Sequence, residues 1–239
     1  MERLINESLF LKIDAGVAKR SNATDSKSVT LVVSQVRILS PAFFKMDLPI
    51  TREEAINVLK SMPQLDSDMN HYLESEAIMR KLAKKFNTDE EYWGMLGLLH
   101  DIDWTFTKNN WKEHGIKAKE MLKQIGFDEE FIENIQSHTY GYEEIPIFKE
   151  RKRDSKIQHA LAAAETITGI IHAYALMRGK KVSDMDAKGL KKKFSDKRFA
   201  ANCNRDIIRE IELTELTLDE FFELSIEAIK EIKEQVGLE

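Results

Sequence analysis

Cysteine, proline and glycine are all scarce in this chain of 239 residues. The single cysteine, Cys203, cannot form an internal disulfide and favours a reducing compartment, so we expect the protein in the cytoplasm. Four prolines and ten glycines are few for a β-sandwich. No apolar run approaches the roughly 20 residues that span a bilayer, and residues 1–4 lack the features of a secretory signal.

An excess of positive charge is also absent. The formal net charge is -5 at pH 7, so the sequence gives no reason to expect a broadly basic surface or a nucleic-acid duplex as partner. The chain instead has 42% hydrophobic and 32% charged residues, which is enough to bury a full core. Its usage of Lys, Glu, Leu, Ala and Ile favours helices.

Residues 1–45 differ in character from the rest of the chain. They hold no sustained helical period. The wording of residues 17–28 and 36–41 resembles the spurious translation of a transfer-RNA gene. We therefore predict that residues 1–45 are either a poorly ordered leader or a start-site artefact, with the coded product starting at Met46. No function is placed on them.

Beyond residue 45 the sequence predicts helix after helix and no sheet. Thr51 and Glu54 make a capping-box pattern at the start of the first helix. Residues 155–178 are nearly all apolar and are predicted to form a buried central helix. The other predicted helices cover residues 71–86, 88–100, 113–125, 128–138, 186–194 and 217–236. Residues 46–239 are thus predicted to be one all-α domain, a multi-helix bundle.

Histidines and acids recur in or beside these apolar helices, where an unpaired charge is costly. His71 and the pair His100-Asp101 are one helix apart, so a helical hairpin would bring them together. The other members of the set lie at helix ends or on the central helix: His114, His138 and Glu165. Imidazole nitrogens and carboxylate oxygens are ligands of divalent transition metals, so these residues predict a metal site if they meet in space.

Each of these residues also has a simpler interpretation. A lone histidine on an apolar face is more often a hydrogen-bonded structural residue, and we assign His159 and His172 to that class. Glu165 within its apolar helix needs a cation, an ion-pair partner or a proton. Asp101 alone could be a helix cap or a turn residue. The metal interpretation rests on the co-occurrence of four of the six histidines with two acids.

The ordered series of histidines and acids resembles the HD-domain superfamily of metal-dependent phosphohydrolases, specifically its compact HDIG-type predicted hydrolases. The matching segments are residues 71–79, 97–104, 113–115, 137–138, 164–169 and 191–199, with Asn204-Arg205. The resemblance covers residues 46–239, about four-fifths of the chain. It is far more specific than a bare His-Asp dipeptide, and it implies an HD-type helical bundle.

The resemblance also implies a ligand set. The ligands of a first ion would be His71, His100, Asp101 and Glu165. Those of a second ion would be Asp101, as a bridge, with His114 and His138. The superfamily usually has Asp where this chain has Glu165, which puts the last ligand of the first ion in doubt. Mixed ligands of this kind do not distinguish Mn, Fe, Co, Ni, Zn and Mg, and one or two ions per chain are expected.

Three further residues join Asp101 as candidates for the catalytic machinery. Asp103 would orient a water, hydrogen-bond a ligand from behind, or cap the next turn. A phosphate substrate also needs cations besides the metal, and the basic cluster of residues 191–198 is the obvious supply, with Arg205 nearby. A lysine run is about as often a solvated helix face. Lys191 and Arg205 are the members that we expect to reach the phosphate.

Together with the resemblance, these features predict a phosphomonoesterase or phosphodiesterase that uses metal-activated hydroxide on a small phosphorylated substrate, for which a nucleotide is one candidate. The alternative is a catalytically weak or inactive metal-binding regulatory module, in which the change to Glu165 has removed turnover. A metal-dependent oxygenase of similar fold is a third interpretation, and the basic cluster favours phosphate over it. Amphipathic terminal helices are compatible with a homodimer, and no membrane partner is expected.

Overall fold

The computed structural model describes residues 46–239, which belong to one compact unit and contain helices and turns but no strand in that range. The predicted leader, residues 1–45, lies outside the described residues. The all-α prediction is therefore confirmed for the domain that carries the candidate site. The α-helices are α1 (Arg52–Lys60), α2 (Asp66–Phe86), α3 (Glu90–Leu99), α4 (Trp104–Thr107), α5 (Ile116–Ile125), α6 (Glu129–Gln136), α7 (Lys156–Met177), α8 (Ala187–Ser195), α9 (Arg205–Arg209) and α10 (Leu218–Ile232). The 3-10 helices are η1 (Trp111–Glu113), η2 (Ser137–Thr139) and η3 (Glu210–Thr214).

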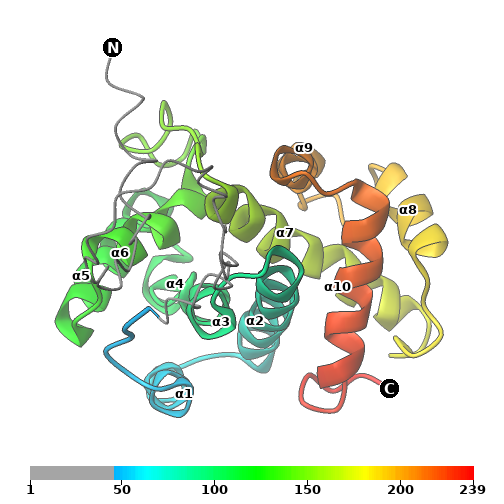
Figure 1. Cartoon of the computed structure of the whole chain (residues 1–239), viewed down its shortest axis with the longest axis horizontal. Coiled ribbons are helices and arrows are strands. Elements are labelled where there is room, and N and C mark those ends of the chain that lie inside the picture. The colour runs from blue at the N-terminus through cyan, green and yellow to red at the C-terminus, as the bar shows by residue number, and fades with distance from the viewer. Residues whose placement is uncertain (1–45) are drawn as a thin grey trace, which may run out of the picture. The chain divides into compact units, whose positions relative to one another are not determined.

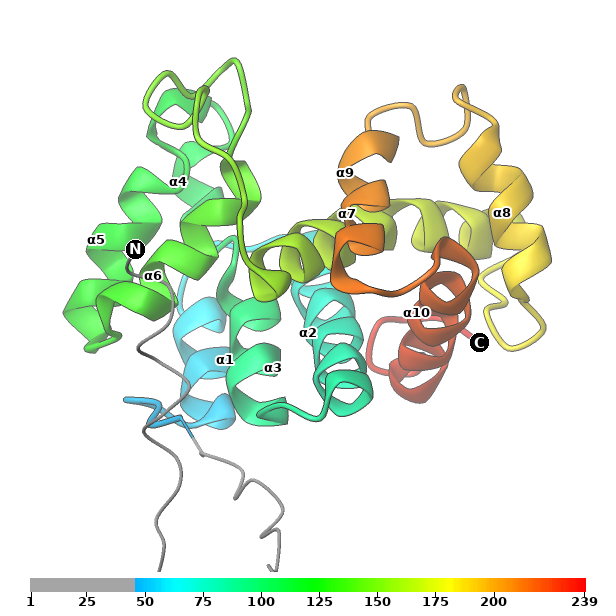
Figure 2. The same ribbon diagram turned by 45° about the horizontal axis from the view of Figure 1, so that its top comes forward.

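The long helix α7 forms the centre of the fold, as its apolar sequence predicts. It crosses the unit, with α4, α5 and α6 toward one end and α8, α9 and α10 toward the other (Figure 1, Figure 2). Helices from both ends contact it, and so do α2 and α3. In length and apolarity α7 would also suffice to cross a membrane, but 61% of its most apolar window is buried inside the fold. Burial in a core therefore accounts for its composition.

The packing of α3 on α2 positions the first part of the site. Gly97 allows the two helices to approach closely, because a Cβ at this position would lie 2.6 Å from the carbonyl oxygen of Ser75. Both helices also supply fully buried core residues, such as Ile78 and Leu96. The end of α3 is thereby held against the first half of α2, which confirms the predicted helical hairpin.

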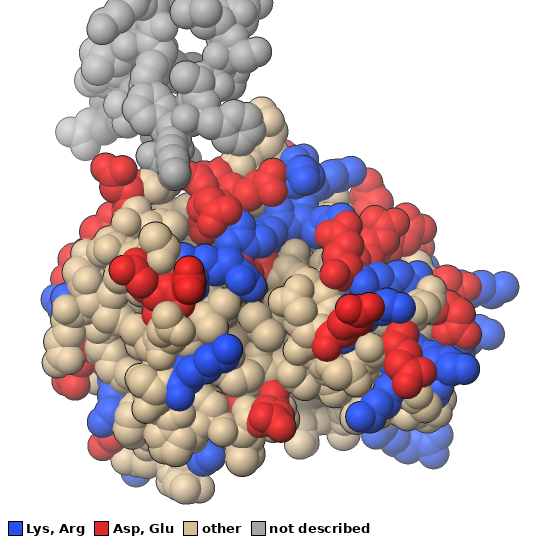
Figure 3. Space-filling view, turned by 90° about the horizontal axis from the view of Figure 1, so that it is seen from below, with Lys and Arg blue, Asp and Glu red and all other residues tan. Residues whose placement is uncertain are grey.

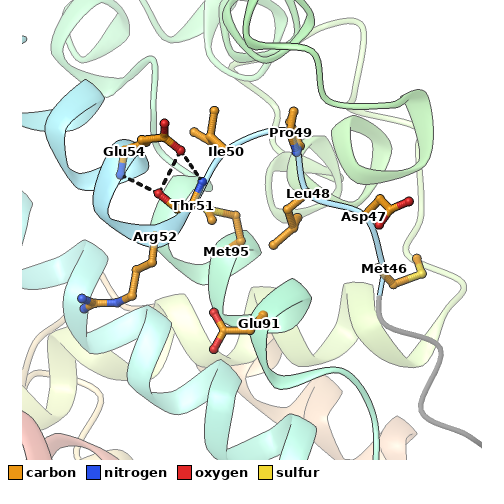
Figure 4. A pocket seen from close by; sticks show the side chains of 10 residues that line it. All are labelled: Met46, Asp47, Leu48, Pro49, Ile50, Thr51, Arg52, Glu54, Glu91 and Met95. Carbon is orange, nitrogen blue, oxygen red and sulfur yellow. Dashed lines mark hydrogen bonds between the residues drawn. The ribbon is translucent and has the colours of Figure 1, made fainter.

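Capping residues stabilise several helix starts and ends. Thr51 and Glu54 form the predicted capping box of α1, in which each side chain bonds the backbone N–H of the other residue (Figure 4). Gly126, with φ 106°, ends α5 in the left-handed conformation that glycine favours. Helices α4 and α9 were not predicted from the sequence. They have four and five residues and are too short to show a helical period.

Charged side chains of both signs are mixed on the face shown in Figure 3, where Lys and Arg lie between Asp and Glu. No field of one sign extends over this face. Such mixing is compatible with the small net charge of the chain, -5. It agrees with the expectation that a nucleic-acid duplex is not a partner, which stays a prediction.

Candidate metal centre

Four histidines and one aspartate converge at the ends of several helices. His71 lies on α2, whereas His100 and Asp101 directly follow α3. His114 ends η1 just before α5, and His138 lies in η2 just after α6. Because α2, α3, α5 and α6 supply core residues, the side chains on or next to these helices are presented from a rigid scaffold. The structure thus brings these five residues together, and their role as metal ligands stays a prediction.

The five side chains form two groups that share Asp101. In the first group, the Nε2 atoms of His71 and His100 lie 3.0 Å apart, and they lie 3.9 and 3.7 Å from Asp101 Oδ2. In the second group, the Nε2 atoms of His114 and His138 lie 3.1 Å apart, and they lie 3.3 and 3.2 Å from Asp101 Oδ1. Each oxygen of Asp101 therefore faces one pair of imidazoles.

Hydrogen bonds behind two of the rings determine which nitrogen carries the proton. His100 Nδ1 lies 2.8 Å from the carbonyl oxygen of Gly97, and His138 Nδ1 lies 2.6 Å from that of Ile135. A carbonyl oxygen can only accept, so Nδ1 donates in both rings. In the neutral imidazole the Nε2 atom is then left with a lone pair.

The ring of His71 is oriented in the same way through a hydroxyl group. Its Nδ1 lies 2.9 Å from Thr168 Oγ1, and that hydroxyl donates its own hydrogen to the carbonyl oxygen of Glu165 at 2.6 Å. Thr168 Oγ1 must therefore accept from His71 Nδ1. Facing Nε2 lone pairs about 3 Å apart repel each other unless a cation or a proton lies among them. The chemistry of the donor set thus fits a divalent metal ion.

Asp103 is fully buried and holds His114 in place from behind. Its Oδ1 accepts from His114 Nδ1 at 2.9 Å, and its Oδ2 accepts from the backbone N–H groups of Gly115 and Ala118 at 2.8 and 3.1 Å. One carboxylate thereby orients a ligand and caps the start of α5. These are two of the three roles that the sequence allowed for Asp103.

Burial and neighbouring charge set the protonation of the ligands. Burial lowers the pKa of His100 to about 3, which keeps its imidazole neutral. Burial also acts to lower the pKa of His114, but its hydrogen bonds to Asp101 and Asp103 outweigh it and raise that pKa to about 10. Burial alone would raise the pKa of Asp101, yet the surrounding imidazoles hold it well below its usual range. A cation in the second group must therefore displace a proton from His114.

Glu165 lines the same cavity but belongs to neither ligand group. Its Oε1 lies 2.5 Å from Thr166 Oγ1, and burial raises the pKa of its carboxyl against the opposing effect of His138 and His71. Burial therefore disfavours the charged form of Glu165, and the hydroxyl of Thr166 is its hydrogen-bond partner. The structure does not bring Glu165 to the first group, and a ligand role for this residue stays a prediction.

The two cations expected at the phosphate are engaged elsewhere. Lys191, on the exposed face of α8, lies 2.7 Å from both carboxylate oxygens of Asp219. Arg205 donates to several backbone carbonyls of the loop before α9, among them that of Cys203 at 2.7 Å. Neither side chain lines the cavity. The loop between α8 and α9 contributes Asn202 to the lining instead.

A cavity of about 370 Å³ opens onto the ligands, a size typical of small-molecule sites. Its lining consists of Asp68, His71, Tyr72, Asp101, Trp104, Trp111, His114, His138, Thr139, Tyr142, Glu165 and Asn202. His100 is 0% exposed and is not part of this lining.

Sequence reasoning missed the aromatic part of the cavity. Trp104 directly follows the His-Asp-Ile-Asp segment, Trp111 precedes His114 by three residues, and Tyr142 follows His138 by four. Adjacency to the proposed ligands was the signal that could have found them. From their hydrophobic character alone, these three residues are predicted to lie in the core, which is the more frequent place for aromatic side chains.

Comparison with known families matches residues 69–183 to the model of the HD domain. The matched range contains both ligand groups, Asp103 and Glu165, and it leaves out Lys191 and Arg205. The comparisons with curated proteins and with solved structures give no match. The match confirms the resemblance to the HD-domain superfamily, whereas membership of the HDIG-type subgroup stays a prediction.

Proposed function

The chain belongs to the HD-domain superfamily through residues 69–183, and from this premise we propose that it is a metal-dependent phosphohydrolase acting on a small phosphate ester. Proteins with this domain are generally hydrolases. The observation that carries the proposal is the pair of His/Asp groups sharing Asp101, with the imidazole Nε2 atoms facing one another. Two closely spaced ion sites are a recurrent arrangement in enzymes that hydrolyse phosphate esters.

Each group would hold one divalent ion, the first through His71 and His100 and the second through His114 and His138. Asp101 would serve both ions. When bound, such an ion polarises a phosphoryl oxygen and activates water at neutral pH. We propose one or two ions of Mn, Fe, Co, Ni, Zn or Mg, since mixed nitrogen and oxygen ligands do not select among them.

The residues of the chain prepare this chemistry before any substrate arrives. Asp103 fixes the ring of His114, and Thr168 fixes that of His71, so both rings have a single productive orientation. Asp101 is charged, and it keeps an anionic oxygen between each pair of imidazoles. A site that needs no reorganisation at the moment of reaction is favourable for catalysis.

The test is hydrolysis of an aryl phosphate by the full chain after reconstitution with each metal in turn. We expect metal-dependent release of phosphate, and its loss in His100→Ala and Asp101→Ala. His172→Ala serves as a matched control, because this histidine lies outside both groups. Undiminished hydrolysis in both ligand variants would defeat the proposal. If the activity depends on metal and is lost in the ligand variants, a screen of nucleotides and phosphorylated metabolites would identify the substrate class.

A second candidate function is a metal-binding regulatory module with little or no turnover. The position of Glu165 outside both ligand groups favours it, because the family's usual aspartate at this place would be the last ligand of the first ion. Glu165→Asp separates the two functions. If the wild-type chain binds metal without hydrolysing any ester and Glu165→Asp gains activity, the regulatory interpretation is correct.

A further inference from the structure

Among the aromatic side chains that line the cavity, Trp104, Trp111 and Tyr142 are linked by ring contacts, and they are here called the aromatic wall. The rings of Trp104 and Trp111 lie 5.4 Å apart in an edge-on contact, and those of Trp111 and Tyr142 lie 6.1 Å apart. Trp104 and Trp111 also contact the ring of His114, at 5.6 and 6.0 Å. The aromatic wall therefore adjoins the second ligand group directly.

Trp111 is unusual within the aromatic wall because 39% of this large side chain is exposed. Its ring is nevertheless held by Trp104 on one side and Tyr142 on another, in geometries that aromatic pairs prefer. A fixed aromatic surface at a cavity is prepared for stacking at little further cost in conformational entropy. A flat ring placed on it would remove apolar area from water on both partners.

The charges around the cavity limit the number of phosphate groups that it can accept. Among the described residues, its lining includes Asp68, Asp101 and Glu165 but no Lys or Arg. Extended phosphate chains need several cationic partners to offset their charge. The metal sites would therefore have to compensate the phosphate almost alone, which suits one phosphate group better than three.

From the aromatic wall, its contact with the ligands and the acidic lining, we infer that the site takes a monophosphate ester of a planar aromatic group, as in a nucleoside monophosphate. Water would add at phosphorus, the ester P–O bond would break, and the leaving oxygen would take up a proton to give the free nucleoside and inorganic phosphate. The hydrolytic step rests on the proposed function. Stacking on the aromatic wall does not, because it needs no metal.

The first arm of the test measures stacking alone. Adenosine and ribose are titrated against the full chain as purified, and contact is detected by saturation transfer from protein to ligand protons. We expect transfer to the base protons of adenosine and little to ribose. Trp111→Leu should abolish the preference for adenosine, and Trp111→Phe should retain most of it. Phe106→Leu is the matched control, since this exposed aromatic lies outside the cavity lining.

The second arm compares kcat/KM for adenosine monophosphate, ribose 5-phosphate and adenosine triphosphate on the metal-loaded protein. We expect a preference of about tenfold for adenosine monophosphate over ribose 5-phosphate, which falls toward unity in Trp111→Leu through KM. The triphosphate should be the poorer nucleotide.

The outcomes distinguish failure of the inferred stacking on the aromatic wall from failure of the proposed hydrolytic function. Equal contact with adenosine and ribose, or a preference that survives Trp111→Leu, overturns the inference even if phosphate esters are hydrolysed. A better triphosphate substrate also overturns it. Failure to hydrolyse any ester would defeat the proposed function and the hydrolytic step, whereas the stacking arm would still decide the role of the aromatic wall.

Discussion

The six histidines of the chain fall into two classes that differ in the partner of their Nδ1 atom. Around the cavity, three of the four clustered rings donate through Nδ1 to a carbonyl or hydroxyl oxygen. Each of these rings directs its Nε2 toward the Nε2 of a neighbouring histidine. His159 and His172, both on α7, instead pair through Nδ1 with the carboxylates of Glu210 and Glu74, each at 2.7 Å. The first class is prepared to bind a cation, and the second forms internal hydrogen bonds with carboxylates.

His114 belongs to the cavity but combines features of both classes. Its Nδ1 meets the carboxylate of Asp103, and its Nε2 faces that of Asp101. The two carboxylates raise its pKa to about 10 although burial acts in the other direction. The comparison teaches that a nearby acid does not by itself exclude a ligand role. What matters is whether the other ring nitrogen, Nε2, faces the remaining members of the ligand group.

The largest effect on activity is expected for Asp101→Asn, which would remove the carboxylate that both groups of cavity histidines share. Without the shared anion, both imidazole pairs lose the partner that balances a cation. Activity should fall by roughly a thousandfold or more. Steady-state kinetics of the metal-loaded protein measures the loss. Asp206→Asn, an exposed aspartate on α9, is the control, and a loss of less than tenfold in Asp101→Asn would contradict a shared ligand.

A smaller effect is expected for Asp103→Asn, because it leaves all ligands in place but changes the support of His114. An amide offers only one acceptor oxygen where the carboxylate accepts three hydrogen bonds. Metal affinity should fall about 10- to 100-fold, as measured by calorimetric titration with Mn²⁺. Asp128→Asn changes a cap of α6 that supports no histidine and should leave the affinity unchanged. Equal affinity in both variants would contradict the role of Asp103.

The ion pair of His172 should produce a modest pH dependence of stability. The hydrogen bond to Glu74 raises the pKa of His172 above its ordinary value of 6.5, although burial opposes it. The charged pair therefore contributes to the free energy of unfolding fully below pH 6.5, and the contribution is lost as pH rises through the raised pKa. Urea unfolding of wild type and His172→Gln should show a larger stability difference near pH 6 than near pH 9. A constant difference would show that the pair does not titrate in this way.

The smallest effect is expected for Lys191→Gln. This lysine is exposed and paired with an equally exposed aspartate, an interaction that contributes roughly 0–1 kcal/mol. Its loss should change kcat/KM for a phosphate ester by less than about twofold. A tenfold loss would instead show that Lys191 reaches the substrate, as the sequence had suggested.

Much of the fold and of the ligand set could be predicted because both depend on burial. The apolar periods of α2, α3 and α7 require those helices to pack together, and His71, His100 and Glu165 are carried with them. The order of the histidines and acids then indicates the family through its resemblance to the HD-domain superfamily. Asp103 was singled out because it belongs to the His-Asp-Ile-Asp segment that contains two of the proposed ligands.

The remaining parts depend on distances that a sequence does not contain. Arg205 looks like a free cation in the sequence, but in the fold its guanidinium satisfies the carbonyls of its own loop. Lys191 has its aspartate on another helix, twenty-eight residues away. Trp111 looks like a core residue until the structure shows it at a cavity.

The metal content of the purified chain tests the central claim most directly. After reconstitution with Mn²⁺ and removal of free ions, elemental analysis should find at least one tightly bound ion per chain in the wild type. Asp101→Ala should hold none, because both ligand groups need this residue. Absence of bound metal in the wild type, or an undiminished content in Asp101→Ala, would contradict a shared metal centre at these residues.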